Sequence, residues 1–347
     1  MLAALVIIAF GLRVGRPVLT PVLLAAFVAA VTAPLVLWLR ERGVPTLLAV
    51  GAGLLVDALA IGGVALVVGG AVAELTQRQG FYQSRFSEIL EETRAWLLVN
   101  GIEVSRDSLR NLVDPEFLVD VLGEGLRRIA AVLSRFVLVL FIVAFMLVEA
   151  THLRRKLNLV VQDSKDMGAV REAGRELKGF LVVKVGTSAT TALAAGLLCK
   201  LLKIDLPLLW ALLAFLLNFI PTVGSIIAAI PPTILALLLH GPTTALAVAG
   251  GYIVINAAIG SILEPRLMGD ALGLSPLVVF LSMLVWGYLL GIVGALLSPI
   301  LTMLVKTWMA HTDDLRWAAI WMGPAPKEKK KAADDPAVPS ESPVQSS

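Results

Sequence analysis

The polar residues best placed to handle a solute gather at one interruption of a long apolar stretch. Asn218, Thr222 and Ser225 lie around Pro221 and Gly224, in a region without Asp, Glu, Lys or Arg. In hydrocarbon, a broken helix persists only where protein packs around it or where it lines a wet cavity. Helix ends there offer free N–H and C=O groups beside amide and hydroxyl side chains, which suits a polar, uncharged solute. Tight helix packing at a turn is the alternative interpretation.

A second group consists of ionisable residues inside apolar segments. Asp57 lies in the middle of one such segment and Lys184 near the start of another. A charge at the centre of a bilayer costs about 3 kcal/mol on insertion scales, so each one requires a partner. We expect Asp57 and Lys184 to be possible partners. They form either a static ion pair or a proton- or cation-linked switch, unless they extend to the lipid edge.

A third group, Glu264, Arg266 and Gly269, surrounds a proline at position 265. The residue before a proline is biased away from the α conformation, so we expect the apolar span to end at Glu264. The charged stretch is then either a membrane-edge ion pair or an extended gate that changes partners as a solute passes. Asn256, eight residues earlier, lies near the same helical face and could form a hydrogen bond across helices.

The composition shows what kind of protein must position these residues. The 347 residues are 58% hydrophobic and 16% charged, with a mean hydropathy of +0.86, whereas soluble domains are about 25% charged. Such values over this length require many apolar segments rather than one anchor. We therefore expect an all-α, polytopic membrane protein whose main partner is the lipid bilayer.

Several classes of chemistry are disfavoured by the residue inventory. Cys199 is the single cysteine, and His152, His240 and His311 lack the spacing of metal ligands, so we expect no metal and no cofactor. The basic residues stand in short blocks between apolar segments, where membrane topology explains them, so no nucleic-acid partner is expected. Asp57 and Asp270 lack the motifs of an intramembrane aspartyl protease, and we expect no enzymatic activity.

The order of apolar and polar segments predicts the organisation of the chain. The expected parts are transmembrane segments 1–3 in residues 1–73, an extramembrane helical insert in 74–128, a fourth segment in 129–149, a cytoplasmic basic loop in 150–178, a C-terminal transmembrane bundle in 179–310 and a disordered cytoplasmic tail in 324–347. The loop is placed in the cytoplasm by the positive-inside rule, because it carries Arg154, Arg155, Lys156, Lys165, Arg171, Arg175 and Lys178.

Within the C-terminal bundle, proline and glycine indicate two broken or re-entrant hairpins, in residues 206–239 and 271–305. The first hairpin belongs to a stretch without Asp, Glu, Lys or Arg, residues 206–263, in which breaks are expected at Pro221, at Gly224, at Pro231-Pro232 and at Gly241-Pro242. The second stretch, 271–305, is expected to be interrupted at Gly287, Gly291, Gly294 and Pro299. Two such broken segments are the strongest indication of a transport site that a sequence can give.

Residues 213–232, 252–256, 262–269, 272–280 and 286–294 carry motifs that resemble the autoinducer-2 exporter family of bacterial membrane proteins. The resemblance covers about residues 10–310. It implies a multi-pass inner-membrane permease with about eight transmembrane segments, acting on autoinducer-2 or related small polar metabolites. Its matching positions imply that the family's characteristic residues are Asn218, Pro221, Gly224, Asn256, Glu264, Pro265, Arg266 and Gly269. With the hydroxyl residues of the first break added, the expected substrate pathway consists of Asn218, Pro221, Thr222, Gly224, Ser225, Asn256, Glu264, Arg266 and Gly269. The chain departs from the family pattern around Gly291 and Gly294, where a proline is often found.

Three functions remain open from the sequence. The first is passive or ion-coupled export of a small polar solute. The second is sodium or lithium/proton antiport through Asp57, Lys184 and Glu264, since other relatives resemble antiporters. The third is a non-transporting, oligomeric membrane scaffold that binds through the insert. A homo-oligomer is expected as a partner in each case.

Overall fold

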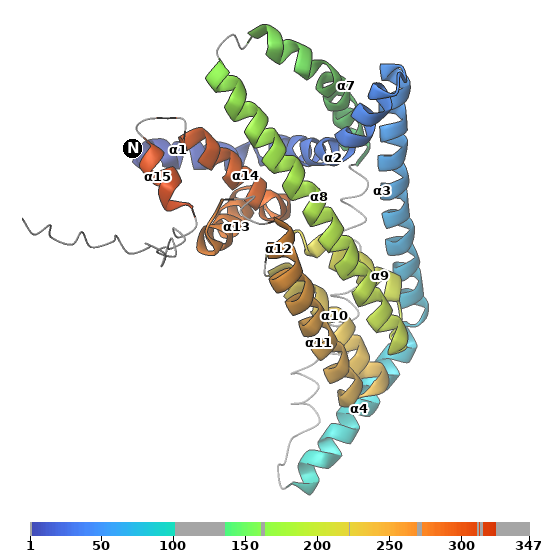
Figure 1. The fold of residues 1–347 in the computed structure, drawn as a ribbon. Helices are drawn as coiled ribbons and strands as arrows, with labels where there is room; N and C mark the ends of the chain where they lie inside the picture. Colours follow the sequence, from blue (N-terminus) through green and yellow to red (C-terminus); the bar gives the residue numbers. More distant parts are fainter. Residues whose placement is uncertain are drawn as a thin grey trace, which may run out of the picture.

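The computed structural model describes residues 2–100, 136–160, 164–221, 223–268, 273–310, 312 and 315–323, and every regular element in these ranges is a helix (Figure 1). The N-terminal half contains α1 (Leu2–Val14), α2 (Arg16–Glu41), α3 (Thr46–Gln77), α4 (Gln79–Val99) and α7 (Phe136–Val160). The C-terminal half contains α8 (Ser164–Leu201), α9 (Pro207–Leu217), α10 (Val223–His240), α11 (Pro242–Asn256), the π-helix η1 (Ala257–Leu263), α12 (Glu264–Met268), α13 (Pro276–Leu290), α14 (Ile292–Ala310) and α15 (Arg316–Trp321).

Six helical stretches among the described residues are long and apolar enough to cross a bilayer. They are Arg16–Glu41, Thr46–Gln77, Gly174–Leu201, Val223–His240, Pro242–Leu267 and Ile292–Ala310. Shorter apolar helices cover Phe136–His152, Pro207–Leu217 and Pro276–Leu290. The prediction of an all-α, polytopic membrane protein is confirmed.

One apolar core joins α2, α3 and α7. Small side chains on α2 and α3 let these helices approach closely, and the larger Val143 and Leu147 of α7 fill the space beside them. Gly53 of α3 lies so near α2 that a Cβ there would come 2.8 Å from Val36 Cγ2. Close contact through small residues is how helices associate inside a membrane.

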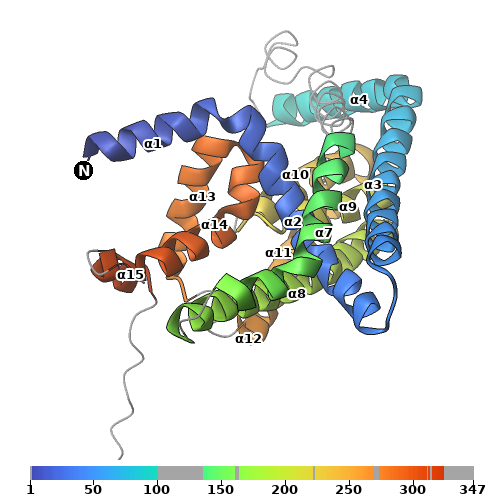
Figure 2. The ribbon, with the colours of Figure 1, turned by 90° about the horizontal axis from the view of Figure 1, so that it is seen from above.

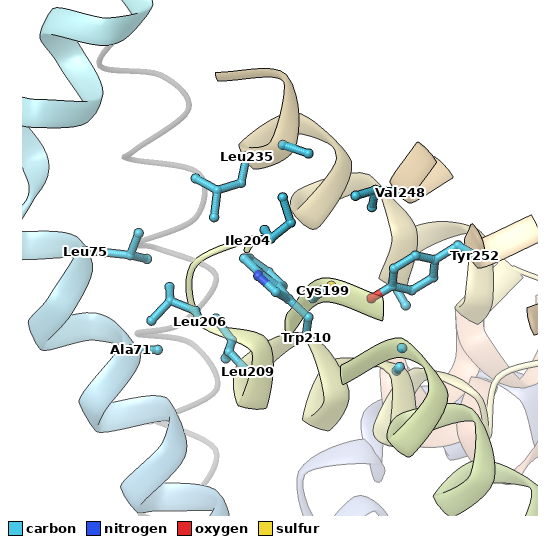
Figure 3. Close-up of a cluster of buried hydrophobic side chains, with 14 of the residues drawn as sticks. Ala71, Leu75, Cys199, Ile204, Leu206, Leu209, Trp210, Leu235, Val248 and Tyr252 are labelled. Atoms are coloured by element: carbon cyan, nitrogen blue, oxygen red, sulfur yellow. The ribbon is translucent and has the colours of Figure 1, made fainter. Parts of the chain in front are cut away.

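A second core joins the C-terminal half of α3 to α8, α9, α10 and α11 (Figure 3). Trp210 of α9 lies at its centre, only 1% exposed, and its indole N–H donates to the carbonyl of Asp205 at 2.7 Å. Tyr252 and Val248 come from α11, while Ala71 and Leu75 approach from α3 (Figure 3). This core fixes the position of α9, and therefore of the chain break that follows it.

The breaks in the C-terminal half differ in part from those expected. The chain turns at residues 218–221, at Gly241, whose φ is +81°, and at Gly291, whose φ is +72°. Pro231 and Pro232 were expected to interrupt the chain, but α10 runs through both. Gly287, Gly294 and Pro299 were also expected to be breaks, but they lie inside α13 and α14. A membrane helix tolerates proline where neighbouring helices cover the freed carbonyls, and Pro232 is buried against other elements.

The second hairpin, α13 and α14, stands beside α1, α2 and α8 (Figure 2). Arg13 of α1 donates to the hydroxyl of Tyr288 at 2.7 Å and lies over the same ring. The guanidinium of Arg16 occupies the place where a side chain at Gly291 would point. Two N-terminal cations therefore contact this hairpin.

Helices extend further into the polar segments than the sequence indicated. Residues 150–178 were expected to be a loop, yet α7 continues to Val160 and α8 begins at Ser164. These residues are rich in Arg, Lys, Glu and Leu, which favour helix, and helix propensity does not stop at a membrane boundary. In the expected insert 74–128 the structure describes the end of α3 and α4, while the remainder and the tail 324–347 lie outside the described residues.

Candidate functional site

The site is built on a polar face of α8, inside the spanning part of that helix. Lys184, Thr187, Ser188 and Thr191 recur at the spacing that places side chains on one helical face. All of them are buried, with exposed fractions between 0% for Ser188 and 6% for Thr191. A buried polar face in a membrane helix requires partners, since unpaired polar groups are costly in hydrocarbon.

Glu264 supplies the first of these partners. Lys184 Nζ donates to Glu264 Oε1 at 2.6 Å, and the two side chains are only 7% and 16% exposed. Thr187 Oγ1 donates to the carbonyl of Lys184 at 3.2 Å and approaches Glu264 Oε2 at 3.4 Å. The ion pair thus joins two helices whose residues stand 80 positions apart in the sequence.

The helix does not end at Glu264, as the following proline had led us to expect. The chain passes from α11 through η1 into α12, which includes Glu264 and Pro265. The Glu264 N–H donates to the carbonyl of Ile259, five residues back, so the π turn adjusts the backbone just before the proline, which has no N–H of its own. π segments of this kind are frequent at functional sites.

Asn256 lies directly before the π turn. The sequence placed Asn256 near the same face as Glu264, on the assumption of a regular α-helix. In the structure its side chain packs over Gly260, where a Cβ would come 2.9 Å from Asn256 Oδ1. Asn256 is half-buried at the last residue of α11, directly before the π segment.

Asn218 supplies the second set of contacts to α8. Asn218 ends α9, and its Nδ2 donates to Ser188 Oγ at 2.9 Å, with both side chains buried. The next residue, Phe219, packs its ring against Phe27 of α2 and Phe215 of α9 at centroid distances of 5.5 and 5.6 Å. The break between α9 and α10 and the π turn after α11 therefore meet the same polar face of α8.

Asp57 does not join this site. Thr32 Oγ1 donates to Asp57 Oδ1 at 2.6 Å, which binds α3 to α2, and Lys184 pairs with Glu264. The expected Asp57–Lys184 partnership is therefore wrong. Within the described part of the chain, Asp57 Oδ2 is buried without a hydrogen-bond partner.

The remaining residues expected in the pathway are spread around this centre. Gly224 is buried and Pro221 and Ser225 are half-buried near the first break, whereas Arg266 is exposed on α12. Thr222 and Gly269 lie outside the described residues. Across the described ranges, no group of three or more His, Cys, Asp or Glu side chains forms a metal cluster.

Sequence reasoning did not assign a role to Thr187 and Ser188. Their position three and four residues after Lys184 was the available signal, since such residues share its helical face. The sequence does not show which elements face α8, so the same two residues are equally typical of close helix packing through small side chains.

Comparisons with known proteins identify the family of the chain. Residues 2–314 match the model of the AI-2E family transporters. The chain is 37% identical to the AI-2 transport protein TqsA of Escherichia coli K12, over 94% of this chain and 96% of that protein. It is 34% identical to a putative transport protein of Haemophilus influenzae, over 93% and 94% of the two chains, and 32% identical to the putative transport protein YhhT of Escherichia coli K12, over 94% and 95%. This chain therefore belongs to the AI-2E family of membrane transporters.

Proposed function

We propose that this protein exports a small, polar, largely uncharged solute across the bacterial inner membrane, and that the solute is autoinducer-2 or a related metabolite. The observation that carries the proposal is the meeting of two interrupted helices on the polar face of α8. Interrupted membrane helices place backbone dipoles and polar side chains where a solute passes. The printed name of the relative TqsA supports autoinducer-2 as the first solute to test.

The direct test is solute counterflow in proteoliposomes made with the purified full-length chain. Vesicles loaded with unlabelled autoinducer-2 are diluted into a trace of labelled autoinducer-2, and transient uptake is compared with protein-free vesicles. We expect labelled autoinducer-2 to accumulate transiently inside the vesicles, because the outflow of unlabelled solute drives its uptake. Uptake equal to that of empty vesicles for autoinducer-2 and for a panel of small polar metabolites would remove the proposal.

The contact between Asn218 and Ser188 gives a second prediction. Asn218→Leu removes the amide that binds Ser188 and leaves a buried hydroxyl without its donor, a loss of about 1–3 kcal/mol. We expect the initial rate of counterflow to fall by about tenfold, the equivalent of 1.4 kcal/mol. Thr190→Ala is a matched control, because Thr190 is exposed on α8 and bonds only within its own helix. Equal rates in both variants would place the solute elsewhere.

Cation/proton antiport is the second candidate, and two observations favour it. The Lys184–Glu264 pair is almost fully buried, and Asp57 holds a second carboxylate inside α3. Antiport predicts that sodium or lithium added outside acid-loaded vesicles dissipates their pH gradient, and that Asp57→Asn or Glu264→Gln abolishes the effect. A pH-sensitive dye reports the result. A wild-type protein that moves autoinducer-2 but no protons in response to either cation excludes antiport.

A homo-oligomer remains a prediction, as does an assembly role for residues 74–128. Deleting these residues and measuring the size of crosslinked species tests both together. An unchanged size removes the role of the insert, and a monomer in the full-length chain removes the oligomer.

A further inference from the structure

A groove separate from the α8 site lies where the C-terminal half of α3 passes the turn between α8 and α9. Its volume is about 630 Å³, within the range of small-molecule sites. The α3 side is lined by Leu66, Val67, Gly70 and Ala71, and apolar residues of the turn complete the wall. Lys200 and Lys203 also line the groove, and both are exposed. The charged lining is completed by Glu74 and Asp205.

The two acidic residues that line the groove, Glu74 and Asp205, already have partners outside the lysine pair. Asp205 Oδ2 accepts from Arg78 Nη1 and from the hydroxyl of Tyr82, each at 3.0 Å. Arg78 also contacts Glu74 at 3.5 Å. No ion pair of Lys200 or Lys203 is formed with any residue in the described ranges, so these two cations remain available to an anion.

The backbone of the turn holds Lys203 in an unfavourable conformation. After α8 ends, the Lys203 N–H donates to the carbonyl of Lys200 at 3.1 Å and the Ile204 N–H to that of Cys199 at 2.8 Å, the Schellman arrangement. Lys203 has a φ of +57°, at the position where glycine is normally found. Leu206, with a φ of +60°, is a second left-handed residue in the same turn.

The surroundings force this conformation on the chain. The carboxylate of Asp205 is fixed by Arg78 and Tyr82, and its carbonyl by Trp210. Burial is the main reason that the pKa of Tyr82 is raised, so its hydroxyl stays protonated and continues to donate. Strained residues persist where the structure over-determines them, and they concentrate at functional positions. A glycine would adopt the backbone conformation at position 203 with less strain. We therefore infer that a lysine stands there because its side chain has a role.

We propose that this groove binds an anionic phospholipid, with the phosphate held by Lys200 and Lys203 and an acyl chain lying against α3. An apolar channel along a membrane-spanning helix fits an acyl chain, and basic pockets between such helices bind lipid head groups. A free phosphate would use the lysines but not the apolar wall. The site is independent of the transport proposal.

The test is native mass spectrometry of the purified full-length protein with dioleoyl phosphatidylglycerol and dioleoyl phosphatidylcholine. We expect phosphatidylglycerol to bind more tightly, by about fivefold for each lysine, the effect of one basic residue near an anionic lipid surface. Lys203→Gly should lose that share of the preference while its melting temperature stays equal or rises, because glycine relieves the left-handed strain. Lys178→Ala, which removes an exposed lysine elsewhere on α8, should keep the preference.

A second pair of variants tests the apolar wall. A Cβ at Gly70 or at Gly69 meets nothing within 4 Å, so a side chain at either position can leave the helix surface. Gly70 lines the groove, so Gly70→Leu should weaken the binding of both lipids although the two lysines are intact. Gly69→Leu should leave the binding of both lipids unchanged. Equal affinity for the two lipids, a preference that survives Lys200→Ala/Lys203→Gly, or displacement by inorganic phosphate alone would overturn the proposal. A change of oligomer size with Gly70→Leu and unchanged lipid binding would identify a subunit contact instead, and would also overturn it.

Discussion

Glu264→Gln is expected to abolish solute counterflow and to lower the melting temperature of the protein. The substitution leaves Lys184 charged, buried and without the carboxylate that now accepts its hydrogen bond at 2.6 Å. Breaking a buried ion pair by removing one partner costs about 3–5 kcal/mol, because the remaining charge is uncompensated. The contact of Thr187 with the same carboxylate is weakened as well. Lys184→Met should cause a loss of similar size.

A double variant separates a transport role from a purely structural one. Replacing a whole buried ion pair by apolar residues of similar volume is often neutral or stabilising. We therefore expect Lys184→Met/Glu264→Leu to recover the melting temperature that either single substitution loses. If the pair changes partners during transport, counterflow stays at the background rate in this well-folded variant. Recovery of both stability and counterflow would mean that the pair only holds α8 to α12.

The measurements are thermal unfolding followed by intrinsic fluorescence in detergent, and counterflow in vesicles with equal amounts of reconstituted protein. Lys178→Met is the matched control for Lys184→Met, because Lys178 is exposed on the same helix. Substitutions at such surface positions change stability by about 0.5 kcal/mol or less. A Lys178→Met protein as impaired as Lys184→Met would show that the loss comes from the helix rather than from the ion pair.

The sequence located the first break of the site but not what the break contacts. A proline and a glycine three residues apart, in a segment too short to cross a bilayer, were enough to predict an interruption near Asn218. The bond from Asn218 to Ser188 depends on how α9 packs against α8, and the residues are 30 positions apart. Hydropathy records which residues are apolar, and it carries no information about which helices are neighbours.

Glu264 shows the same limit at the level of the backbone. The preference of a residue before proline predicted an end to the helix, and it is a local rule. In the structure a π turn is inserted immediately before, and packing against α8 stabilises the continued helix. The expected pairing of Asp57 with Lys184 was wrong for a related reason. Two opposite charges in apolar segments suggest a pair, but Asp57 accepts from Thr32 of α2, and Lys184 pairs with Glu264.

Gly224→Ala is expected to destabilise the protein as a whole. A methyl group at this position would penetrate the carbonyl of Leu217 and come 3.1 Å from Ile220 Cβ. Because the obstacle is backbone rather than a mobile side chain, the turn between α9 and α10 would have to open. Overpacking of this kind costs about 3 kcal/mol or more when the surroundings cannot adjust. Gly294→Ala meets the carbonyl of Trp286 in the second hairpin and should behave alike.

Gly250→Ala is a control for which we expect the opposite change in melting temperature. Gly250 lies inside α11, and a Cβ there meets nothing within 4 Å. Alanine is favoured over glycine in a helix interior by about 0.5–1 kcal/mol, so this variant should melt at or above the temperature of the wild type. A Gly224→Ala protein that melts like Gly250→Ala would show that the turn has room for a side chain. In that case Asn218 would not be held against Ser188 by the turn, and the first interruption would lose the geometry on which the transport proposal rests.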